Sequence, residues 1–418
     1  MILVAALSGR AIAQAVARTG AAVATLDQFG DADLPLPARC VAGDPVTGFD
    51  REALIAAART LAPPGSGLVV GSGFEQAPGL LAALIQAGPY RLLGNRPEVV
   101  RAVKDPAGFA ARLAALGLEG LEIRHPETRV AMPDDAIPED WLVKRAGAAG
   151  GCHIVPWTGG PLPDGHYLQR RAAGRPTSVA FIADRSGRCE TVAISRQWAD
   201  PAPDAPFRYG GAVLPAAMPQ SLADRLADAA RRIAAAFGLV GLNSLDLLVD
   251  GMSVTVLEVN PRPGATLDLL ERHRQGGVMR AHLDAAAGRG WKLGAARPGI
   301  IAGAVAYAPS ALTVPADFPW PPWCADLPRA GSAVGGRTAA VQRHRLGRGR
   351  GRGAVPSVRP DRTHRRGLHA AGLFCGENRR CRPFPSVLAG LPHPWSMPWW
   401  RTPPCCGSGW SSTPPAAP

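Results

Sequence analysis

The sequence predicts an α/β domain with an open parallel sheet, then an α+β domain of two lobes, and finally a tail without a regular fold. Three observations support this prediction. Strands and helices alternate regularly up to residue 94, helices and antiparallel strands then alternate irregularly, and the last part of the chain has no periodicity of 3.6 or 2 residues. The expected segments are an N-terminal α/β domain (1–95), a small lobe with a linker helix (96–170), a large lobe with an acidic hairpin (171–295), a closing segment (296–335) and the tail (336–418).

The N-terminal domain opens with a β-α-β pattern. A buried strand at 1–6 precedes a helix that we expect Ser8 to cap and Gly20 to end, and a second strand follows at 21–30. Gly9 alone stands in the first turn, where a dinucleotide site would need GxGxxG, so we do not expect such a cofactor. The strand and turn "GLVVGSGFE" end at Glu75. Because ligands bind at strand ends in open α/β sheets, Glu75 is a candidate substrate contact.

The second half contains longer elements. We expect one helix at 97–117, strands at 141–146, 152–157 and 167–174, a hairpin that turns at 184–187, and a long helix that ends at Gly238. A second hairpin, "SLDLLVDGMSVTVLEVN", occupies 244–260.

This second hairpin ends with a carboxylate and an amide two residues apart. Side chains alternate along a strand, so Glu258 and Asn260 are predicted to share one face, with Leu257 and Val259 on the other. Asp246 joins that face only if the loop has the right parity, and we expect a three-residue loop with Gly251 in the left-handed region. Three hard oxygen donors on one face suit Mg²⁺, which combines few protein ligands with phosphate oxygens. The alternative is a hairpin whose carboxylates are merely solvated.

The scarcity of lysine indicates a second part of the site. The chain has 46 basic residues, and only Lys104, Lys144 and Lys292 among them are lysines. A lysine in so arginine-rich a chain can mark a place that needs a compact point charge, as phosphate sites do. Lys144 stands just before the glycine-rich stretch 147–151, whose backbone amides could close over phosphates. The alternative is an ordinary mobile hairpin loop.

These motifs resemble the ATP-grasp enzymes, a superfamily that includes carboxylate-amine ligases and the ATP-binding parts of biotin carboxylase and carbamoyl-phosphate synthase. The similarity covers about residues 1–310 and is most specific in "VKDPAGFAARLAALG", "WLVKRAGAAGG", "YLQRRAAG" and "LDLLVDGMSVTVLEVNPRPG". The resemblance implies ATP and Mg²⁺ (or Mn²⁺) as cofactors. It assigns the metal to Asp246, Glu258 and Asn260, the ATP phosphates to Lys104 and Lys144, and the transferred phosphate to Arg262. It also makes Gly147, Gly150 and Gly151 a flap, and Gln169 and Arg170 the adenine hinge.

Two positions depart from the family pattern. The hinge reads Gln169, Arg170 and Arg171 where an acidic residue often holds the ribose, and Asp105 follows Lys104 instead of preceding it. The resemblance implies an ATP-dependent ligase that joins a carboxylate to an amine through an acyl phosphate. The stretches "GSGFE", "NPRPGATLDLLE" and "PGIIAGAVAYAP" are most similar to a branch in one-carbon cofactor biosynthesis that includes tyramine-glutamate ligase of the methanofuran pathway, so glutamate and an aromatic amine are the first substrate expectation.

Two other functions stay open at this point. A bicarbonate-phosphorylating enzyme similar to biotin carboxylase would need a biotin carrier, and the chain has no Met-Lys-Met biotinylation site. A nucleotide-binding protein with little catalysis is the other alternative.

The composition is that of an ordinary enzyme outside the tail. Of the net charge of +13, about +12 falls in residues 336–418, which hold fourteen Arg and no Lys. This composition favours a frame disruption near residues 334–337 over a nucleic-acid-binding arm, because GC-rich codons read out of frame give Arg, Pro, Gly, Trp and Cys. Unpaired cysteine spacing and the lack of a signal peptide or membrane span predict a cytoplasmic protein without structural zinc or membrane partners, and leave a homo-oligomer open.

Overall fold

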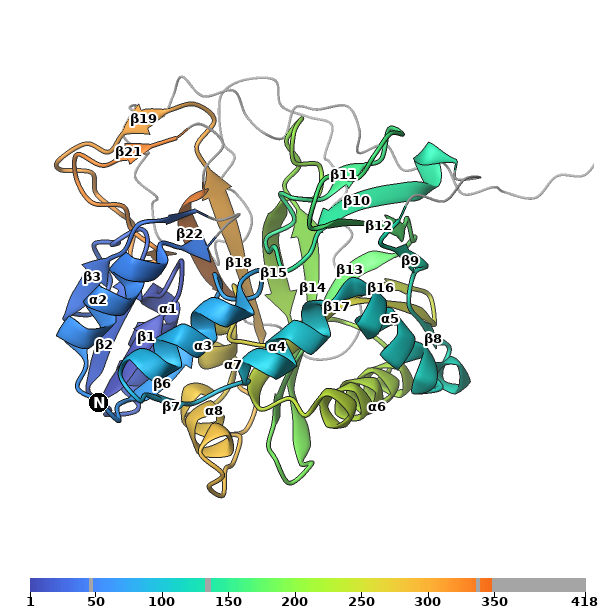
Figure 1. Ribbon diagram of the computed structural model, residues 1–418, viewed down its shortest axis with the longest axis horizontal. Coiled ribbons are helices and arrows are strands. Elements are labelled where there is room, and N and C mark those ends of the chain that lie inside the picture. The colour runs from blue at the N-terminus through green and yellow to red at the C-terminus, as the bar shows by residue number, and fades with distance from the viewer. Residues whose placement is uncertain (45–47, 132–136, 336–338, 348–418) are drawn as a thin grey trace, which may run out of the picture. The chain divides into compact units, whose positions relative to one another are not determined.

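The computed structural model describes residues 1–44, 48–131, 137–335 and 339–347. Its N-terminal part is the expected parallel sheet, in the order β3-β2-β1-β6-β7 (Figure 1). The strands are β1 (Ile2–Ala5), β2 (Val23–Asp27), β3 (Ala38–Cys40), β6 (Gly67–Val70) and β7 (Arg91–Leu92), and the helices are α1 (Arg10–Arg18), α2 (Arg51–Leu61) and α3 (Pro78–Ala87). A small separate ladder joins β4 (Gly43–Asp44) to β5 (Gly48–Phe49).

The cap of α1 differs from the sequence-based expectation. The N-cap residue is Gly9, without a side-chain cap, so Ser8 does not play the expected role. Instead, the Asp27 carboxylate at the end of β2 accepts the Gly9 N–H at 2.6 Å. A side chain from the next strand therefore replaces the local cap, because the parallel topology brings the two strand ends together.

Two helices connect this sheet to the rest of the molecule. The single helix expected at 97–117 is divided into α4 (Pro97–Lys104) and α5 (Pro106–Ala115), with Asp105 extended between them. Pro106 explains the break, because the residue before a proline avoids the helical region. As a result, Lys104 stands at the C-terminal end of α4. The 3₁₀ turn η1 (Leu118–Leu121) follows, with β8 (Ile123–Arg124) after it.

A four-stranded sheet in the order β11-β10-β12-β9 forms the small lobe. Its strands are β9 (Thr128–Arg129), β10 (Trp141–Arg145), β11 (Val155–Pro156) and β12 (His166–Arg170), and the turn η2 (Pro138–Asp140) precedes β10. The strand expected at 152–157 is shortened to β11, which leaves a longer loop after the glycine-rich stretch.

The largest sheet has nine strands in the order β20-β22-β18-β15-β14-β13-β16-β17-β8. Its further strands are β13 (Arg175–Ala183), β14 (Cys189–Ala199), β15 (Tyr209–Leu214), β16 (Gly241–Asp250), β17 (Ser253–Asn260), β18 (Ile300–Tyr307), β20 (Cys324–Ala325) and β22 (Ala339–Gly347). The remaining elements are α6 (Gln220–Phe237), α7 (Leu267–His273), α8 (Met279–Ala286), and the pair β19 (Leu312–Thr313) and β21 (Ala333–Val334).

Side chains on the two faces of this sheet enter different cores. On one face Val179, Phe181 and Leu245 pack with α6 in a core that also contains Val256 and Val259. On the other, Ala180 and Ile182 pack with α7, α8 and residues of the N-terminal sheet. Both faces of β13 are therefore buried. The long helix α6 ends at Gly238 in the left-handed region, as expected.

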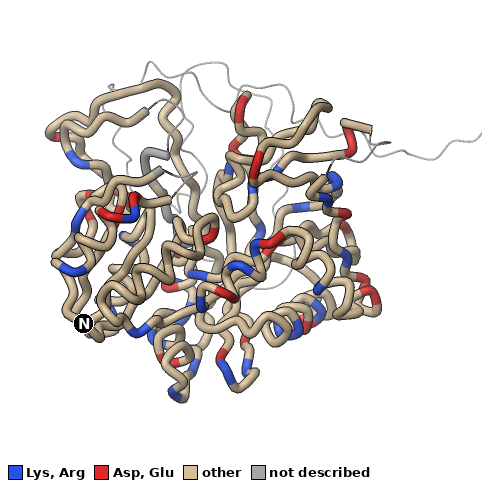
Figure 2. Tube along the Cα trace, viewed as in Figure 1, with Lys and Arg blue, Asp and Glu red and all other residues tan. Residues whose placement is uncertain are grey.

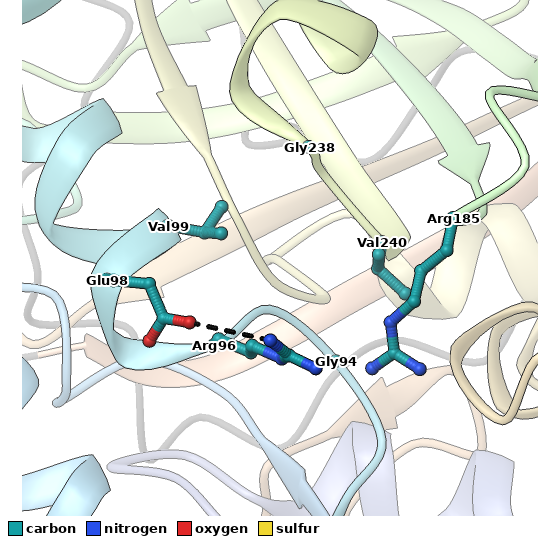
Figure 3. A pocket seen from close by; sticks show the side chains of 7 residues that line it. All are labelled: Gly94, Arg96, Glu98, Val99, Arg185, Gly238 and Val240. Atoms are coloured by element: carbon teal, nitrogen blue, oxygen red, sulfur yellow. Dashed lines mark ion pairs between the residues drawn. The ribbon is translucent and has the colours of Figure 1, made fainter.

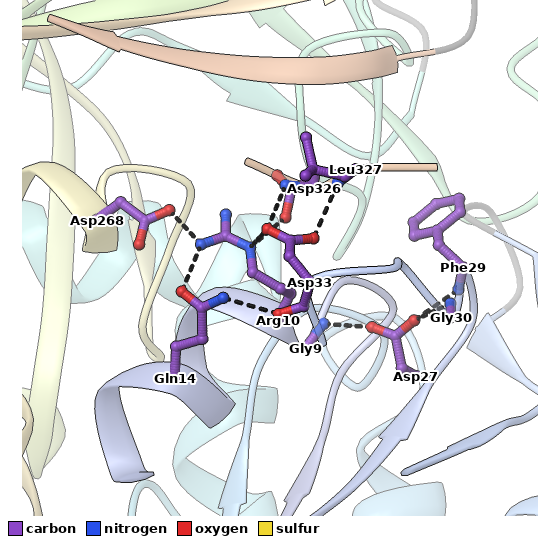
Figure 4. A network of polar contacts seen from close by, with 10 residues as sticks. All are labelled: Gly9, Arg10, Gln14, Asp27, Phe29, Gly30, Asp33, Asp268, Asp326 and Leu327. Atoms are coloured by element: carbon purple, nitrogen blue, oxygen red, sulfur yellow. Dashed lines mark hydrogen bonds and ion pairs between the residues drawn. The ribbon is translucent and has the colours of Figure 1, made fainter. Parts of the chain in front are cut away.

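A buried arginine ties the closing segment to the N-terminal domain (Figure 4). Arg10, only 1% exposed, donates from Nε to Asp326 at 2.8 Å and pairs through Nη1 with Asp268 at 2.6 Å. The Asp33 carboxylate in turn accepts the N–H groups of Asp326 and Leu327. One guanidinium thus holds together α1, α7 and the segment around Asp326.

The tail starts later than the sequence indicates. Residues 339–347 form β22, which pairs with β18 and β20, so the boundary expected at 336 falls too early. The rest of the expected tail, 348–418, lies outside the described residues. Figure 2 shows basic and acidic residues interspersed along the described elements, consistent with the near balance of charge before residue 336. Within the described ranges no helix is both long and apolar enough to cross a membrane.

Candidate active site

The acidic hairpin, β16 and β17, brings Asp246 and Glu258 directly opposite each other. The expected three-residue loop was wrong, because Asp250 pairs with Ser253 around the two-residue turn Gly251–Met252. A two-residue turn alone would have placed the carboxylates on opposite faces. A β-bulge corrects the parity: Leu247 pairs with Val256 but Asp246 pairs with Glu258, so Leu257 is the extra residue.

The bulge also changes the surroundings of Glu258. Val256 and Val259 lie in the core beneath α6, and Asn260 pairs with Ser244 on the same face as the two carboxylates. Leu257 lines the same cavity as Glu258, although strict alternation had assigned it to the opposite face. Simple alternation of side chains could not have identified Leu257, because the extra residue of a bulge shifts every side chain beyond it to the opposite face.

The three oxygen-bearing side chains are held together by hydrogen bonds and by one ammonium group. Asn260 Nδ2 donates to Asp246 Oδ2 at 2.8 Å. Lys104 Nζ lies 3.0 Å from Glu258 Oε2 and 3.3 Å from Asn260 Oδ1. Burial and the nearby Glu258 charge raise the pKa of Asp246. Burial opposes ionisation of Glu258 as well, but the ammonium groups of Lys104 and Lys144 outweigh it and hold the pKa of Glu258 well below its usual value.

Lys144 is buried in the small lobe at the edge of the same site. Its ammonium group, on a residue only 4% exposed, donates to Gln169 Oε1 at 3.0 Å. Burial lowers the pKa of Lys144, and the negative charge of Glu258 only partly opposes this shift. Gln169 is equally buried, whereas Arg170 is exposed and pairs with Asp140 at 3.2 Å. The backbone N–H of Arg170, in the expected adenine hinge, donates to the Glu127 carbonyl at 2.8 Å. This N–H is therefore already used in a hydrogen bond within the protein.

The glycine-rich loop between β10 and β11 lies beside the small lobe's cavity and packs against two other segments. Gly147, Gly150 and Gly151 all have φ near +76°, at +75°, +77° and +76°. A methyl group on Gly147 would lie 2.6 Å from backbone atoms of Gln76, and one on Gly151 would overlap the Phe207 carbonyl. The Gly150 carbonyl accepts the Tyr209 N–H at 2.9 Å. The loop therefore contacts both the N-terminal domain and β15.

His153, in the same loop, was not identified from the sequence. Its pKa is lowered to about 4, chiefly by burial, while the charges of Glu258, Lys144 and Lys104 also act on it. His153 is therefore neutral at physiological pH. A histidine within a glycine-rich loop gave no sequence signal that it would come near the hairpin.

A cavity of about 20 Å³ brings together four of the twelve predicted residues. It is lined by Lys104, Gly147, Gln169, Glu258 and the bulge residue Leu257. Eight further lining residues were missed from the sequence, namely Val103, Pro106, Phe109, His125, Thr128, Arg145, Ala146 and Tyr167. A space of this size holds about one water molecule, so a nucleotide could enter only if the loop moved away.

A larger cavity, of about 220 Å³, lies elsewhere (Figure 3). Its lining includes Arg96, Glu98 and Arg185, with Arg96 and Glu98 3.8 Å apart, and none of the residues predicted for the site. The smaller cavity, in contrast, is lined by Lys104 and the hairpin carboxylate Glu258, so it is the candidate site despite its size.

Arg262 and Glu75 meet at the boundary between the N-terminal sheet and the hairpin. Arg262 Nε donates to Glu75 Oε1 at 2.5 Å, and both side chains are nearly buried. The structure thus brings the two residues together, although the sequence analysis assigned them to different ligands.

The donor set of the hairpin fits a divalent cation. The oxygens of Glu258 and Asn260 converge on the Lys104 ammonium, which shows that this point favours positive charge. Among the described residues no cluster of three or more His, Cys, Asp or Glu could hold a metal alone. A cation at Asp246, Glu258 and Asn260 would therefore complete its shell with phosphate or water oxygens, as Mg²⁺ does.

Comparison with known proteins defines the class. Residues 113–266 match the family model of the ATP-grasp domain. The chain therefore contains an ATP-grasp domain, preceded by a parallel-sheet domain, as the sequence indicated.

Particular solved structures share this fold. Biotin carboxylase from Campylobacter jejuni superposes with a TM-score of 0.62 at 12% identity, over 83% of this chain and 88% of the other. N5-carboxyaminoimidazole ribonucleotide synthetase from Thermus thermophilus gives 0.59 at 18% identity, over 84% and 94%. The biotin carboxylase domain dimer of Hydrogenobacter thermophilus 2-oxoglutarate carboxylase, in complex with MgADP and bicarbonate, gives 0.63 at 12% identity, over 82% and 86%.

Proposed function

We propose that this protein is an ATP- and Mg²⁺-dependent ligase that forms an amide from a carboxylate and an amine. The observation that carries the proposal is the convergence of two lysines and two carboxylates beside a glycine-rich loop. Lys104 and Glu258 line one cavity, Asp246 pairs with Glu258, and the charge of Lys144 interacts with those of both carboxylates. Two buried ammonium groups opposite two carboxylates are suited to bind a polyphosphate through a bridging cation.

The binding roles follow from position. Asp246, Glu258 and Asn260 would hold the metal, and Lys104 and Lys144 would contact the ATP phosphates. Leu257, Phe109 and Tyr167 offer apolar surface for the adenine ring, and Gln169 lines the same cavity. Gln169 and Arg170 would form the hinge that binds adenine. When bound, the metal supplies charge neutralisation that allows an anionic carboxylate to approach the triphosphate.

The remaining chemistry requires positioning and the exclusion of water. The substrate carboxylate attacks the γ-phosphate, forming a bond from carboxylate oxygen to phosphorus as the bond to ADP breaks. The amine then attacks the acyl carbon of the acyl phosphate, inorganic phosphate leaves, and the amine loses a proton. Lys144 and Arg262 offset charge on the transferred phosphoryl group, and the loop over Gly147, Gly150 and Gly151 excludes water while the acyl phosphate exists.

The substrates are proposed from the sequence resemblance. Glutamate and an aromatic amine such as tyramine are the first pair to test, within one-carbon cofactor biosynthesis. A cytoplasmic location and a homo-oligomer also stay predictions. One solved neighbour is a domain dimer by its own description, and sedimentation of this chain would check the second prediction.

The test measures phosphate release from ATP and Mg²⁺ with pools of carboxylates and amines. Release that requires both an amine and a carboxylate supports the proposal. Release that depends on bicarbonate instead would indicate the carboxylase-like alternative. Tight ATP binding without release in any pool would contradict a ligase and favour a nucleotide-binding protein.

A further inference from the structure

The turn after β6, residues 71–76, touches both halves of the proposed site. It lies at the carboxyl end of a parallel strand, where the sequence analysis expected a substrate contact at Glu75. In the structure both oxygens of Glu75 already have partners. Oε1 accepts from Arg262 Nε at 2.5 Å, and Oε2 accepts the Gly73 N–H at 3.1 Å.

The contact with Arg262 is well shielded from water. The side chains of Glu75 and Arg262 are 3% and 10% exposed. A buried guanidinium with a carboxylate at hydrogen-bond distance is held in one orientation, and removal of the carboxylate would leave an uncompensated buried charge. Arg262 follows Asn260 by two residues at the end of β17, so Glu75 fixes the exit of the acidic hairpin relative to the N-terminal sheet.

The glycine-rich loop packs against the same turn. Gly147 approaches the Glu75 carbonyl and the Gln76 backbone so closely that a methyl group would lie 2.6 Å from each. The backbone of the turn therefore contacts the loop, while the side chain of Glu75 binds Arg262. Closure of the loop and placement of the Arg262 guanidinium share one short segment.

We infer that Glu75 is a positioning residue: it holds Arg262 toward the transferred phosphoryl group from the turn against which the loop closes, and it does not itself bind substrate. This inference deepens the proposed function and rests on it. It predicts that loss of the Glu75 charge weakens the chemical step more than substrate binding, because Arg262 acts on charge that develops in the transition state.

The experiment is a double-mutant cycle with Glu75→Gln, Arg262→Gln and the double variant, read by steady-state kinetics and by urea unfolding. We expect Glu75→Gln to lower kcat about 10-fold or more with less than about a 3-fold change in KM for either substrate. The double variant should be no slower than Arg262→Gln alone, because both changes remove the same interaction. Glu98→Gln is the matched control, because Glu98 is 62% exposed on α4 and lies outside the proposed site.

Each other outcome overturns a distinct claim. Kinetic effects that multiply in the double variant would show that Glu75 acts independently of Arg262. A KM increase for one substrate in Glu75→Gln alone would show that Glu75 contacts that substrate. Coupling in unfolding without coupling in kcat would reduce the pair to a structural role. A wild-type chain that never releases phosphate would remove the proposed function together with the catalytic part of this inference, whereas turnover without coupling would remove the inference alone.

Discussion

At the residue scale, Glu258 is the hairpin carboxylate that both contacts a lysine and faces the cavity. It lies opposite Asp246, within 3.0 Å of Lys104, and lines the small cavity. We predict that Glu258→Gln lowers phosphate release by about 100-fold or more, because an amide removes the charge that anchors the cation. The amide has the same shape, so the protein should still fold, but the urea midpoint should fall because Lys104 loses its ion pair.

The control for this prediction is Asp250→Asn, which removes a carboxylate from the exposed tip of the same hairpin. It should leave phosphate release unchanged. Near-normal release by Glu258→Gln would contradict the metal assignment.

Leu257 is the residue that strict alternation placed on the wrong face. Because it lines the cavity beside Glu258, we predict that Leu257→Ala raises KM for ATP by about 10-fold with a smaller effect on kcat, as expected when apolar binding surface is lost equally from ground and transition states. Titration with ATP at fixed carboxylate and amine measures this. Unchanged KM would mean that the adenine ring lies elsewhere.

At the element scale, the glycine-rich loop provides its own control. Gly147 and Gly150 have nearly the same positive φ, but only Gly147 meets another backbone, since nothing lies within 4 Å of a methyl group on Gly150. We predict that Gly147→Ala lowers kcat about 10-fold or more beyond the effect of Gly150→Ala, because it blocks closure in addition to straining the backbone.

The rates of the two alanine variants, and the protection of the loop from protease by ATP, measure this difference. Protection should be lost in Gly147→Ala and kept in Gly150→Ala. Equal effects on rate and protection would show that strain alone is responsible, and that the loop does not close onto the turn at 71–76.

The element scale also shows what the sequence could and could not predict. The helix α6, with its stop at Gly238, and the hairpins β13–β14 and β16–β17 follow from periodicity and turn residues, whereas β15 was not predicted. The carboxylate pair was predicted on one face, but by way of a three-residue loop, whereas the structure uses a bulge at Leu257. A bulge depends on how two paired strands pack against the core that they share. The sequence of one strand alone therefore does not predict it.

Contacts between distant segments were equally hidden from the sequence. The pair of Glu75 and Arg262 joins residues 187 positions apart, and neither local pattern specifies the other. The lysines are the exception: of the three in the chain, Lys144 was chosen for the glycine-rich loop that follows it and Lys104 through the family resemblance, and both lie beside the hairpin carboxylates.

A cluster of acids around Arg10 predicts a pH dependence of stability. Burial, aided by the charges of Asp326, Asp27 and Asp33, raises the pKa of Asp31 to about 8 from an ordinary 3.8, while Arg10 opposes the shift. Between these two values the folded chain keeps a proton that the unfolded chain has released. The contribution of Asp31 to the free energy of unfolding therefore falls as the pH rises through this window.

We predict that Asp31→Asn, which stays neutral, loses less stability than the wild type between about pH 5 and about pH 9. Urea unfolding at several pH values measures the difference. Parallel pH profiles for the two proteins would show that Asp31 ionises normally in the folded state. Asp224→Asn, an exposed change on α6, should leave the wild-type profile intact.

At the scale of the whole molecule, residues 1–351 form one compact unit, and the last strand of that unit lies inside the segment expected to be tail. β22 pairs along β18 from Ile300 to Tyr307 and also receives β20. The strand therefore covers what would otherwise be an open edge beside β18, and exposed edges favour aggregation.

We therefore predict different outcomes for two truncations. A chain that ends at Gly351 should keep the thermal midpoint and the phosphate release of the full protein, because the nine-stranded sheet stays complete. A chain that ends at Gly335 loses β22, and its thermal midpoint should fall by roughly 5 °C or more, since a lost strand costs more than about 1 kcal/mol. Calorimetry and light scattering of the full protein and the two truncated chains test these predictions. Equal thermal midpoints would show that the closing segment does not depend on β22. Loss of soluble protein on truncation at Gly351 would show that the basic tail contributes to folding.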